Sequence, residues 1–357
     1  MGRRESSLAK VGVAMFDNIY KGKTVVVTGH AGVKGSWLSL WLKHLGAKVI
    51  GIGHPPKSGE SHYKTLPQFT FYRDIKADLL FIMREIYSAK PDIVFHLAAK
   101  AIVARTFKEP EETFRNNVMG TAHLLELCRT CPSVKGVVAI TSDKVYKSRE
   151  WNYAYRENDT LGGDDPYSTS KVCVEHIIEC YRKSYGMNIA TARAGNVLCG
   201  GDWAEKRLLP DVVRATIKKE PVIIHTPNAT RPFQHVLEAL QGYLLLGQKI
   251  LQGEDVNRAW NFGPTEGEMT VLAVLERASL IWPDIRWEVD SEPTHKFMVY
   301  LLKLDSTESR KLLGWKQVWD TRRAVMEVVR WYRTYHRHKN VLSLENIKLY
   351  ERGMENV

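Results

Sequence analysis

Two short segments carry side chains whose types and spacing could do acid–base chemistry. Tyr167 and Lys171 stand four residues apart in YSTSK. On a helix they share a face, and an ammonium beside a phenol stabilises the phenolate, so the tyrosine can remove a proton from a substrate hydroxyl. Ser142, Asp143 and Lys144 in TSDKVY present a hydroxyl, a carboxylate and an ammonium together. Alone, the first pattern also fits an exposed helix pair, and the second a solvated loop with a helix cap.

A third motif predicts a phosphate-binding turn. Gly29, Gly32 and Gly35 follow the β-branched run 24–28 and open an apolar helical stretch. Glycines in this context allow a tight turn and a close approach of the backbone to a pyrophosphate, which the helix N-terminus attracts. The motif therefore predicts a dinucleotide site.

The acidic residue that normally binds the cofactor ribose is missing from this pattern. The end of the second predicted strand reads Gly51-Ile52-Gly53-His54, with no carboxylate. The motif by itself therefore leaves NAD and NADP both open. Asp74 in RDIKADL is either an adenine contact or a surface acid.

The elements that must position these residues alternate between strand and helix. Such alternation, with connections too long for hairpins, predicts a doubly wound parallel sheet. The expected order is strand 24–28, helix 36–45, strand 48–53, strand 92–96, helix 105–129 and strand 136–140. After about residue 200 the pattern loosens into a smaller mixed lobe. We expect an N-terminal extension at 1–20, a cofactor-binding domain at 21–195, a mainly substrate-binding lobe at 196–340 and a tail at 341–357.

Composition excludes several classes of protein. The 357 residues are 44% hydrophobic and 25% charged, and no apolar run approaches the ~20 residues of a membrane-spanning helix. Five cysteines are too few for a disulfide framework, and the CxxC of Cys128 and Cys131 lacks the second pair of a structural zinc site. We expect free thiols, no metal and a cytoplasmic location.

The net charge of +11 fits a solvated basic helix near the C-terminus better than a nucleic-acid surface. No recognisable nucleic-acid-binding module surrounds the basic residues of 322–339. We therefore expect neither a nucleic-acid nor a membrane partner. A positive chain is also consistent with an anionic small-molecule substrate.

In this order the three motifs resemble the extended short-chain dehydrogenase/reductase superfamily. The chain resembles more closely the CDP-glucose 4,6-dehydratases, a branch of nucleotide-sugar dehydratases. The similarity runs from about Lys21 to Trp319. It rests on TGHAGVKGSWLSLWL, TSDKVY, YRENDTLGGDDPYSTSK, ARAGNVLCGGDW and RPFQHVLEALQGYLLL, with LKLD and LGW further on.

This resemblance implies a Rossmann-type fold, NAD as cofactor, a homodimer and a role in deoxysugar biosynthesis for lipopolysaccharide O-antigen. It implies that Tyr167 takes the C4 hydroxyl proton, helped by Lys171 and Ser142. It further implies that Asp143 protonates the departing C6 hydroxyl and that Lys144 removes the C5 proton, although a lysine base needs a depressed pKa.

Binding roles follow by matching positions to the family. The cofactor residues implied are Gly29, His30, Gly32, Val33, Lys34, Gly35, Asp74, Ile75, Leu97, Ala98, Ala99 and Asn117, with Tyr167 and Lys171. The substrate residues implied are Arg105, Asn196, Asp202, Trp203, Arg207, Arg231, Gln234 and His235. For His235 a packed core histidine is an equal alternative.

Departures from the family pattern leave the substrate open. Ala31 and Val33 replace Thr and Phe, Lys100-Ala101-Ile102-Val103 replaces Gln-Pro-Leu-Val, and residues 293–296 differ from Pro-His-Glu-Ala. One alternative is a dehydratase for another nucleotide sugar. A second is a 4-epimerase or reductase, which needs no Asp143–Lys144 pair, and a third is a binding module without turnover.

Overall fold

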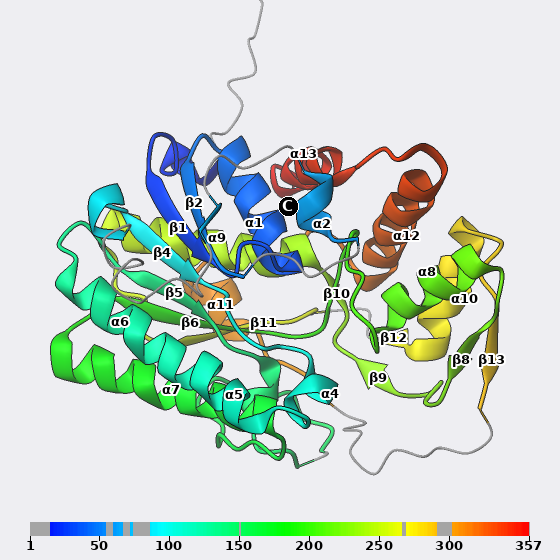
Figure 1. Ribbon diagram of the computed structural model, residues 1–357, viewed down its shortest axis with the longest axis horizontal. Helices are drawn as coiled ribbons and strands as arrows, with labels where there is room; N and C mark the ends of the chain where they lie inside the picture. The colour runs from blue at the N-terminus through cyan, green and yellow to red at the C-terminus, as the bar shows by residue number, and fades with distance from the viewer. Residues whose placement is uncertain are drawn as a thin grey trace, which may run out of the picture.

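A seven-stranded, entirely parallel sheet forms the centre of the protein, as a computed structural model shows (Figure 1). The structure describes residues 15–54, 60–66, 72–73, 86–149, 151–265, 269–290 and 302–356. The strand order is β11-β6-β5-β4-β1-β2-β3. The strands are β1 Thr24–Thr28, β2 Lys48–Ile52, β3 Tyr72–Arg73, β4 Ile93–His96, β5 Val137–Ile140, β6 Ile189–Ala194 and β11 Ala259–Phe262. This confirms the predicted doubly wound fold.

Helices cover both faces of the sheet, and the side chains that the strands turn toward each face are apolar. Val25 and Val27 of β1 pack into one core cluster and Val26 into the other, as the alternation of side chains along a strand requires. Figure 1 shows α1, α9 and α13 above the sheet and α6 and α7 below it. Their bounds are α1 Val33–His44, α6 Gly120–Thr130, α7 Pro166–Tyr185, α9 Val236–Gln252 and α13 Ser343–Met354.

The helix expected over 105–129 is broken into several pieces. They are α4 Val103–Thr106, α5 Pro110–Phe114, a π-helical turn at Arg115–Met119, and then α6. Pro110 stands at the start of α5, where its missing N–H costs nothing, and it cannot continue a preceding helix. The apolar periodicity across this stretch therefore belongs to one face shared by several short helices.

The remaining elements form the smaller mixed lobe that the sequence predicted. Figure 1 shows it on the right, around α8, α10 and α12. The helices of this lobe are α8 Leu208–Lys218, α10 Val271–Ile281 and α12 Thr321–His338. The short helices outside it are η1 Met15–Asn18, α2 His62–Thr65, η3 Asp143–Val145 and α11 Thr307–Leu312. The strands of this lobe are β7 Val197–Leu198, β8 Val222–Ile224, β9 Thr230–Arg231, β10 Gln234–His235, β12 Met269–Thr270 and β13 Trp287–Val289.

The boundaries of these parts differ from those that the sequence suggested. β11 and α9, expected in the second lobe, supply the last strand of the main sheet and a helix on its face. The expected tail contains α13, whose buried Tyr350 packs edge-on against Trp41 of α1. The chain therefore returns to the large sheet after forming the smaller lobe, because apolar contacts between segments far apart in the sequence outweigh proximity in sequence.

Among the helices that the structure describes, none is long and apolar enough to cross a membrane.

A buried histidine connects the start of the sheet to the last helices. His62 is stacked on Trp37 with ring centroids 4.7 Å apart, and its two ring nitrogens lie 2.7 Å from Ser36 Oγ and 2.7 Å from Ser343 Oγ. Ser36 already donates to Val33 O, and Ser343 already accepts from Trp331 Nε1. The arrangement therefore fits a neutral His62 that donates through Nδ1 and accepts at Nε2.

This network makes the fold sensitive to acid. Burial lowers the pKa of His62 to about 3, so the unfolded chain takes up a proton on this ring well before the folded protein does. Stability is complete above the unfolded pKa of about 6.5 and is lost as the pH falls toward the folded pKa. Between about pH 7 and pH 5 this single group costs about 2 kcal/mol of unfolding free energy.

The check is urea denaturation of the wild type and His62→Gln at both pH values. Glutamine can still donate and accept but does not titrate, so the variant should start less stable and lose about 2 kcal/mol less on acidification. Equal losses for the two proteins would show that His62 is not responsible.

Candidate active site

A cleft of about 2220 Å³ opens at the carboxyl ends of the central strands. Its walls include Thr28 after β1, Leu97 after β4, Thr141 after β5 and Gly195 after β6. Ligands of open α/β sheets bind in this position, where the loops diverge on either side of the switch in strand order. The cleft therefore brings together motifs that are far apart in the sequence.

The glycine turn fits a dinucleotide such as NAD. Gly29 has φ of +72°, and a Cβ on Gly35 would stand 2.2 Å from Gly29 O, so the turn requires glycine at both positions. Gly32 caps α1 without a side-chain hydrogen bond, and Gly29, Gly32 and Gly35 all line the cleft. The exposed N–H groups of this helix start form a cradle suited to a pyrophosphate.

The two candidate catalytic segments both line this cleft. Asp165 caps α7 by accepting from the N–H groups of Tyr167 and Ser168, so the tyrosine stands on the first turn. Lys171 Nζ, one helical turn on, donates to Ile140 O over 2.8 Å at the end of β5. This bond ties α7 to the strand that leads into the TSDK segment.

Ser142 connects the groups that carry the chemistry. Its hydroxyl donates to Asp143 Oδ1 over 3.0 Å, and it also acts on the Tyr167 side chain, whose pKa it lowers. Asp143 is buried, and its Oδ2 has no hydrogen-bond partner among the described residues. An acid with one free, buried oxygen at a cleft wall is placed to exchange a proton with a ligand.

Burial dominates the electrostatics of this cluster. It raises the pKa of Asp143, against the lowering effect of the Lys144 charge and the Ser142 hydrogen bond. It raises the pKa of Tyr167 to about 12, although Ser142 and Arg207 act in the opposite direction. It lowers the pKa of Lys171 to about 8. The expectation that the tyrosine titrates near neutral pH is therefore not met by these protein groups, because desolvation of the phenol outweighs them.

Lys34 is a neighbour of the catalytic groups that the sequence placed only at the cofactor. It lines the cleft, and its charge acts on Asp143, Lys171 and Cys199. Burial, together with the nearby Arg207, lowers the pKa of Lys34 to about 8. Its position beside Gly35, at the start of a helix that follows a central strand, was the signal in the sequence.

Most of the other predicted residues also reach the cleft. Arg207 Nη1 lies 2.8 Å from Asp202 Oδ2, and this ion pair forms one wall. Lys144 is half-buried, and Asn196 and Arg105 are exposed at the cleft. The predicted residues that line it are Gly29, Gly32, Val33, Lys34, Gly35, Leu97, Ala98, Ala99, Arg105, Ser142, Asp143, Lys144, Tyr167, Lys171, Asn196, Asp202 and Arg207.

Two of the predicted binding residues are packed in the core instead. Gln234 is buried and donates to Phe262 O over 2.8 Å. His235 is buried, accepts from Leu237 N and packs against Trp37 and Trp319. Neither belongs to the cleft lining. The core alternative for His235 is the one that the structure supports.

Three further predicted residues do not line the cleft and pack against other residues instead. Asn117 is buried, bonding the Lys100 backbone and Ser170 Oγ. His30 is buried and packs edge-on against Tyr63. The Trp203 ring packs against Tyr332 and Tyr335 rather than over the cleft. Motif matching found these positions, but it does not distinguish a residue that touches a ligand from one that supports the wall.

Some of the predictions fall outside the part of the chain that the structure describes. Asp74, Ile75 and the departure at residues 293–296 lie there, as does the side chain of Arg231. The backbone of Arg231 belongs to β9, where it pairs with Met269.

Comparison with known proteins agrees with this geometry. Residues 25–263 match the model of the NAD dependent epimerase/dehydratase family. The chain is 40% identical over 341 residues to CDP-glucose 4,6-dehydratase of Salmonella typhimurium, covering 91% of this chain and 94% of that one.

Solved structures share the fold. UDP-glucose 4-epimerase of Thermotoga maritima, in a structure with UDP-glucose, superposes with a TM-score of 0.79 at 24% identity over 88% of this chain and 99% of that one. UDP-glucose 4-epimerase of Brucella ovis, in complex with NAD, gives 0.76 at 20% identity over 86% and 97%. The matched family model spans most of the sheet and the cleft residues, and with the 40% identical relative it shows that this chain belongs to the NAD dependent epimerase/dehydratase family.

Proposed function

We propose that this protein is an NAD-dependent hydro-lyase that converts CDP-glucose to CDP-4-keto-6-deoxyglucose. The observation that carries the proposal is Asp143: a buried carboxyl, hydrogen-bonded to Ser142 beside Tyr167, with one oxygen left for a ligand. A 4-epimerase or reductase needs the tyrosine, lysine and serine but no such acid. The 40% identical Salmonella dehydratase supports the same activity.

The family match and the glycine cradle support NAD as the cofactor. When bound, NAD would supply the acceptor for the C4 hydride and the source of the C6 hydride, so that the overall reaction would need no external oxidant. The backbone at Gly29, Gly32 and Gly35 holds the pyrophosphate in this proposal, and Leu97, Ala98 and Ala99 after the neighbouring strand β4 line the cleft beside this turn.

The remaining steps belong to side chains of this chain. Tyr167 removes the C4 hydroxyl proton, Ser142 hydrogen-bonds that oxygen, and Lys171 supports the phenolate. The C4 ketone then acidifies the C5 hydrogen, which Lys144 removes. Asp143 donates its proton to the C6 hydroxyl, which departs as water, and protonated Lys144 returns a proton to C5 as C6 receives its hydride. The raised pKa of Asp143 supports its role as the acid, because burial favours the protonated carboxyl, which is the form that can donate a proton.

We assign the nucleotide diphosphate to the wall that contains Asn196 and Arg207, with Arg231 from β9. A guanidinium fork matches phosphate oxygens in geometry and charge. Asp202 holds Arg207 in place over 2.8 Å. Arg105 borders the opposite side of the cleft.

We also propose that the protein works as a homodimer in the cytoplasm, in deoxysugar synthesis for lipopolysaccharide O-antigen. The helical surface α5 to α7 is the expected interface, and Met119 and Tyr185 on it are 48% and 55% exposed. The five free cysteines suit a reducing compartment. A monomeric mass in light scattering at micromolar concentration would contradict the dimer.

Incubation with a panel of nucleotide sugars tests the reaction. Purified protein with NAD is given CDP-glucose and, separately, UDP-, dTDP- and GDP-hexoses, and mass spectrometry follows the loss of one water. Loss from CDP-glucose is the expected result. Water loss from another nucleotide sugar instead would support the dehydration mechanism but assign a different substrate. Formation of an isomer without loss of water would favour a 4-epimerase.

A further inference from the structure

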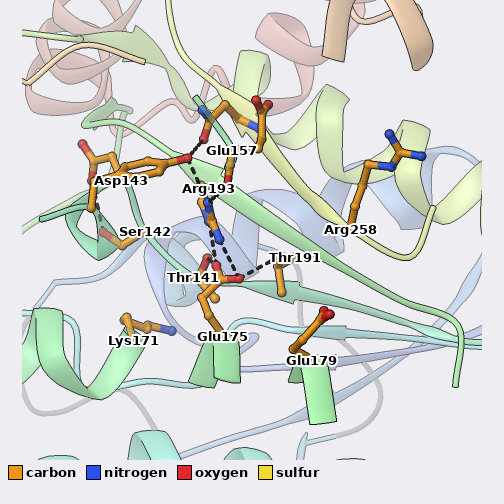
Figure 2. Close-up of polar contacts among 12 residues, drawn as sticks. Thr141, Ser142, Asp143, Glu157, Lys171, Glu175, Glu179, Thr191, Arg193 and Arg258 are labelled. Atoms are coloured by element: carbon orange, nitrogen blue, oxygen red, sulfur yellow. Dashed lines mark hydrogen bonds and ion pairs between the residues drawn. The ribbon is translucent and has the colours of Figure 1, made fainter. Parts of the chain in front are cut away.

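A buried ion pair lies behind the catalytic segment and takes no part in the reaction steps above. Glu175 of α7 and Arg193 of β6 face each other with side chains that are each only 4% exposed. Arg193 Nε lies 2.9 Å from Glu175 Oε1, and Arg193 Nη2 lies 3.0 Å from Oε2 (Figure 2). Such a bidentate fork fixes the two groups in orientation as well as in distance.

Glu175 also binds the start of the catalytic segment. Thr141, the residue before Ser142, donates its hydroxyl to Glu175 Oε1 over 2.6 Å. Thr191 of β6 donates to the other oxygen, Oε2, over 3.1 Å. Both threonines are buried, and Figure 2 shows both bonded to the same carboxylate. Only Thr141 belongs to the segment that carries the reacting groups.

Arg193 binds the far end of the same segment. Its Nη1 donates to Tyr146 Oη over 3.0 Å and to Glu157 O over 2.8 Å. The guanidinium carbon lies 5.0 Å from the centre of the Tyr146 ring, and Tyr146 Oη in turn donates to Asn261 Oδ1 over 2.7 Å. Thr141 and Tyr146 stand on either side of Ser142, Asp143 and Lys144 in the sequence. The Glu175–Arg193 ion pair is therefore hydrogen-bonded to both ends of this segment.

The pair also connects this segment to the other catalytic helix. Glu175 stands one helical turn beyond Lys171 on α7 and two turns beyond Tyr167. A shift of the carboxylate would therefore move the TSDK segment relative to the tyrosine and lysine. Proton transfer tolerates little displacement of the donor from the accepting atom.

We propose that Glu175 and Arg193 are positioning residues, which hold the segment 141–146 in register with α7 so that Ser142 and Asp143 reach the substrate. The inference rests on the proposed function for its effect on turnover. Its effect on the segment itself does not depend on that function.

Removing either charged residue would leave the other buried without an opposite charge and destabilise the whole fold. The test therefore removes single hydroxyls. Thr141→Val deletes one hydrogen bond to Glu175. Thr191→Val deletes one to Glu175 and a longer one of 3.4 Å that Thr191 accepts from Arg182 Nη2, so it should cost at least as much stability. Thr141→Ser keeps the hydroxyl and serves as the rescue variant.

Two measurements distinguish a positioning role of the Glu175–Arg193 pair from a purely structural one. In Thr141→Val, kcat should fall about tenfold or more while KM changes less than about twofold. Amide hydrogen exchange across 142–146 should become faster. Thr191→Val should retain the wild-type kcat and exchange in that segment, despite a drop in Tm that is at least as large, and Thr141→Ser should recover most of kcat.

Equal effects of Thr141→Val and Thr191→Val on kcat and on exchange would overturn the inference and leave the pair with a structural role only. If the wild type releases water from no nucleotide sugar, the proposed function fails, and the exchange difference alone then decides whether the pair positions the segment. Faster exchange confined to Thr141→Val supports it, and indistinguishable exchange refutes it.

Discussion

Tyr167→Phe should reduce kcat for water loss by about a thousandfold, because in the proposed mechanism the phenol oxygen takes the C4 hydroxyl proton. The ring itself remains, so the packing of this buried side chain on the first turn of α7 is preserved. Only the phenol oxygen, the proton acceptor of the proposed mechanism, is lost. The fold should therefore stay intact, and KM should change little.

The measurement follows two products by mass spectrometry in deuterated solvent. One is the dehydrated sugar, and the other is recovered substrate that has gained a deuteron at C5. The variant should form neither, because the C5 hydrogen becomes acidic only after C4 is oxidised. Tyr185→Phe, at the exposed end of the same helix, is the matched control and should retain wild-type rates. A kcat within about threefold of wild type for Tyr167→Phe would rule the tyrosine out as the base.

Asp143→Asn should produce a different pattern, because its loss affects a later step. The asparagine keeps the size of the side chain and a hydrogen bond with Ser142, but it cannot donate a carboxyl proton to the C6 hydroxyl. Water loss should fall by about a hundredfold to a thousandfold. Deuteration of the recovered substrate at C5 should continue, since Tyr167, Lys171 and Lys144 are unchanged.

The two variants thus serve as controls for each other. Tyr167→Phe should abolish both signals, and Asp143→Asn only the water loss. If C5 exchange and water loss fall in the same proportion in Asp143→Asn, the carboxyl acts before elimination or orients the whole segment, and its assignment as the C6 acid is wrong. Because burial raises the pKa of Asp143, water loss by the wild type should also decline as the pH rises through that value and the acid loses its proton.

Local patterns in the sequence were enough to predict the framework of the fold. The β-branched run at 24–28 forms β1 with those bounds, and the strand expected at 48–53 is β2. The glycines that follow β1 form the turn expected of them. These features depend on neighbours along the chain, so periodicity and turn chemistry are sufficient to find them.

The sequence was less informative about whether a helix is continuous and about where each domain begins and ends. The helix expected at 105–129 is interrupted near Pro110, and β11 returns to the main sheet from beyond residue 250. A shared apolar face conceals breaks between short helices, and a four-residue buried strand has no periodicity that reveals its partner.

The chemistry of the site likewise divides into two parts. The types and spacing of Ser142, Asp143, Tyr167 and Lys171 in the sequence already specified a proton-transfer apparatus next to a dinucleotide turn. Motif position did not distinguish a lining residue from a core residue: Gln234 and His235 are buried among core groups, whereas Lys34 lines the cleft and its charge acts on Asp143. Only the tertiary structure decided this, because burial, and with it the pKa of Asp143, is set by residues that are distant in sequence and are brought together by the packing of the sheet.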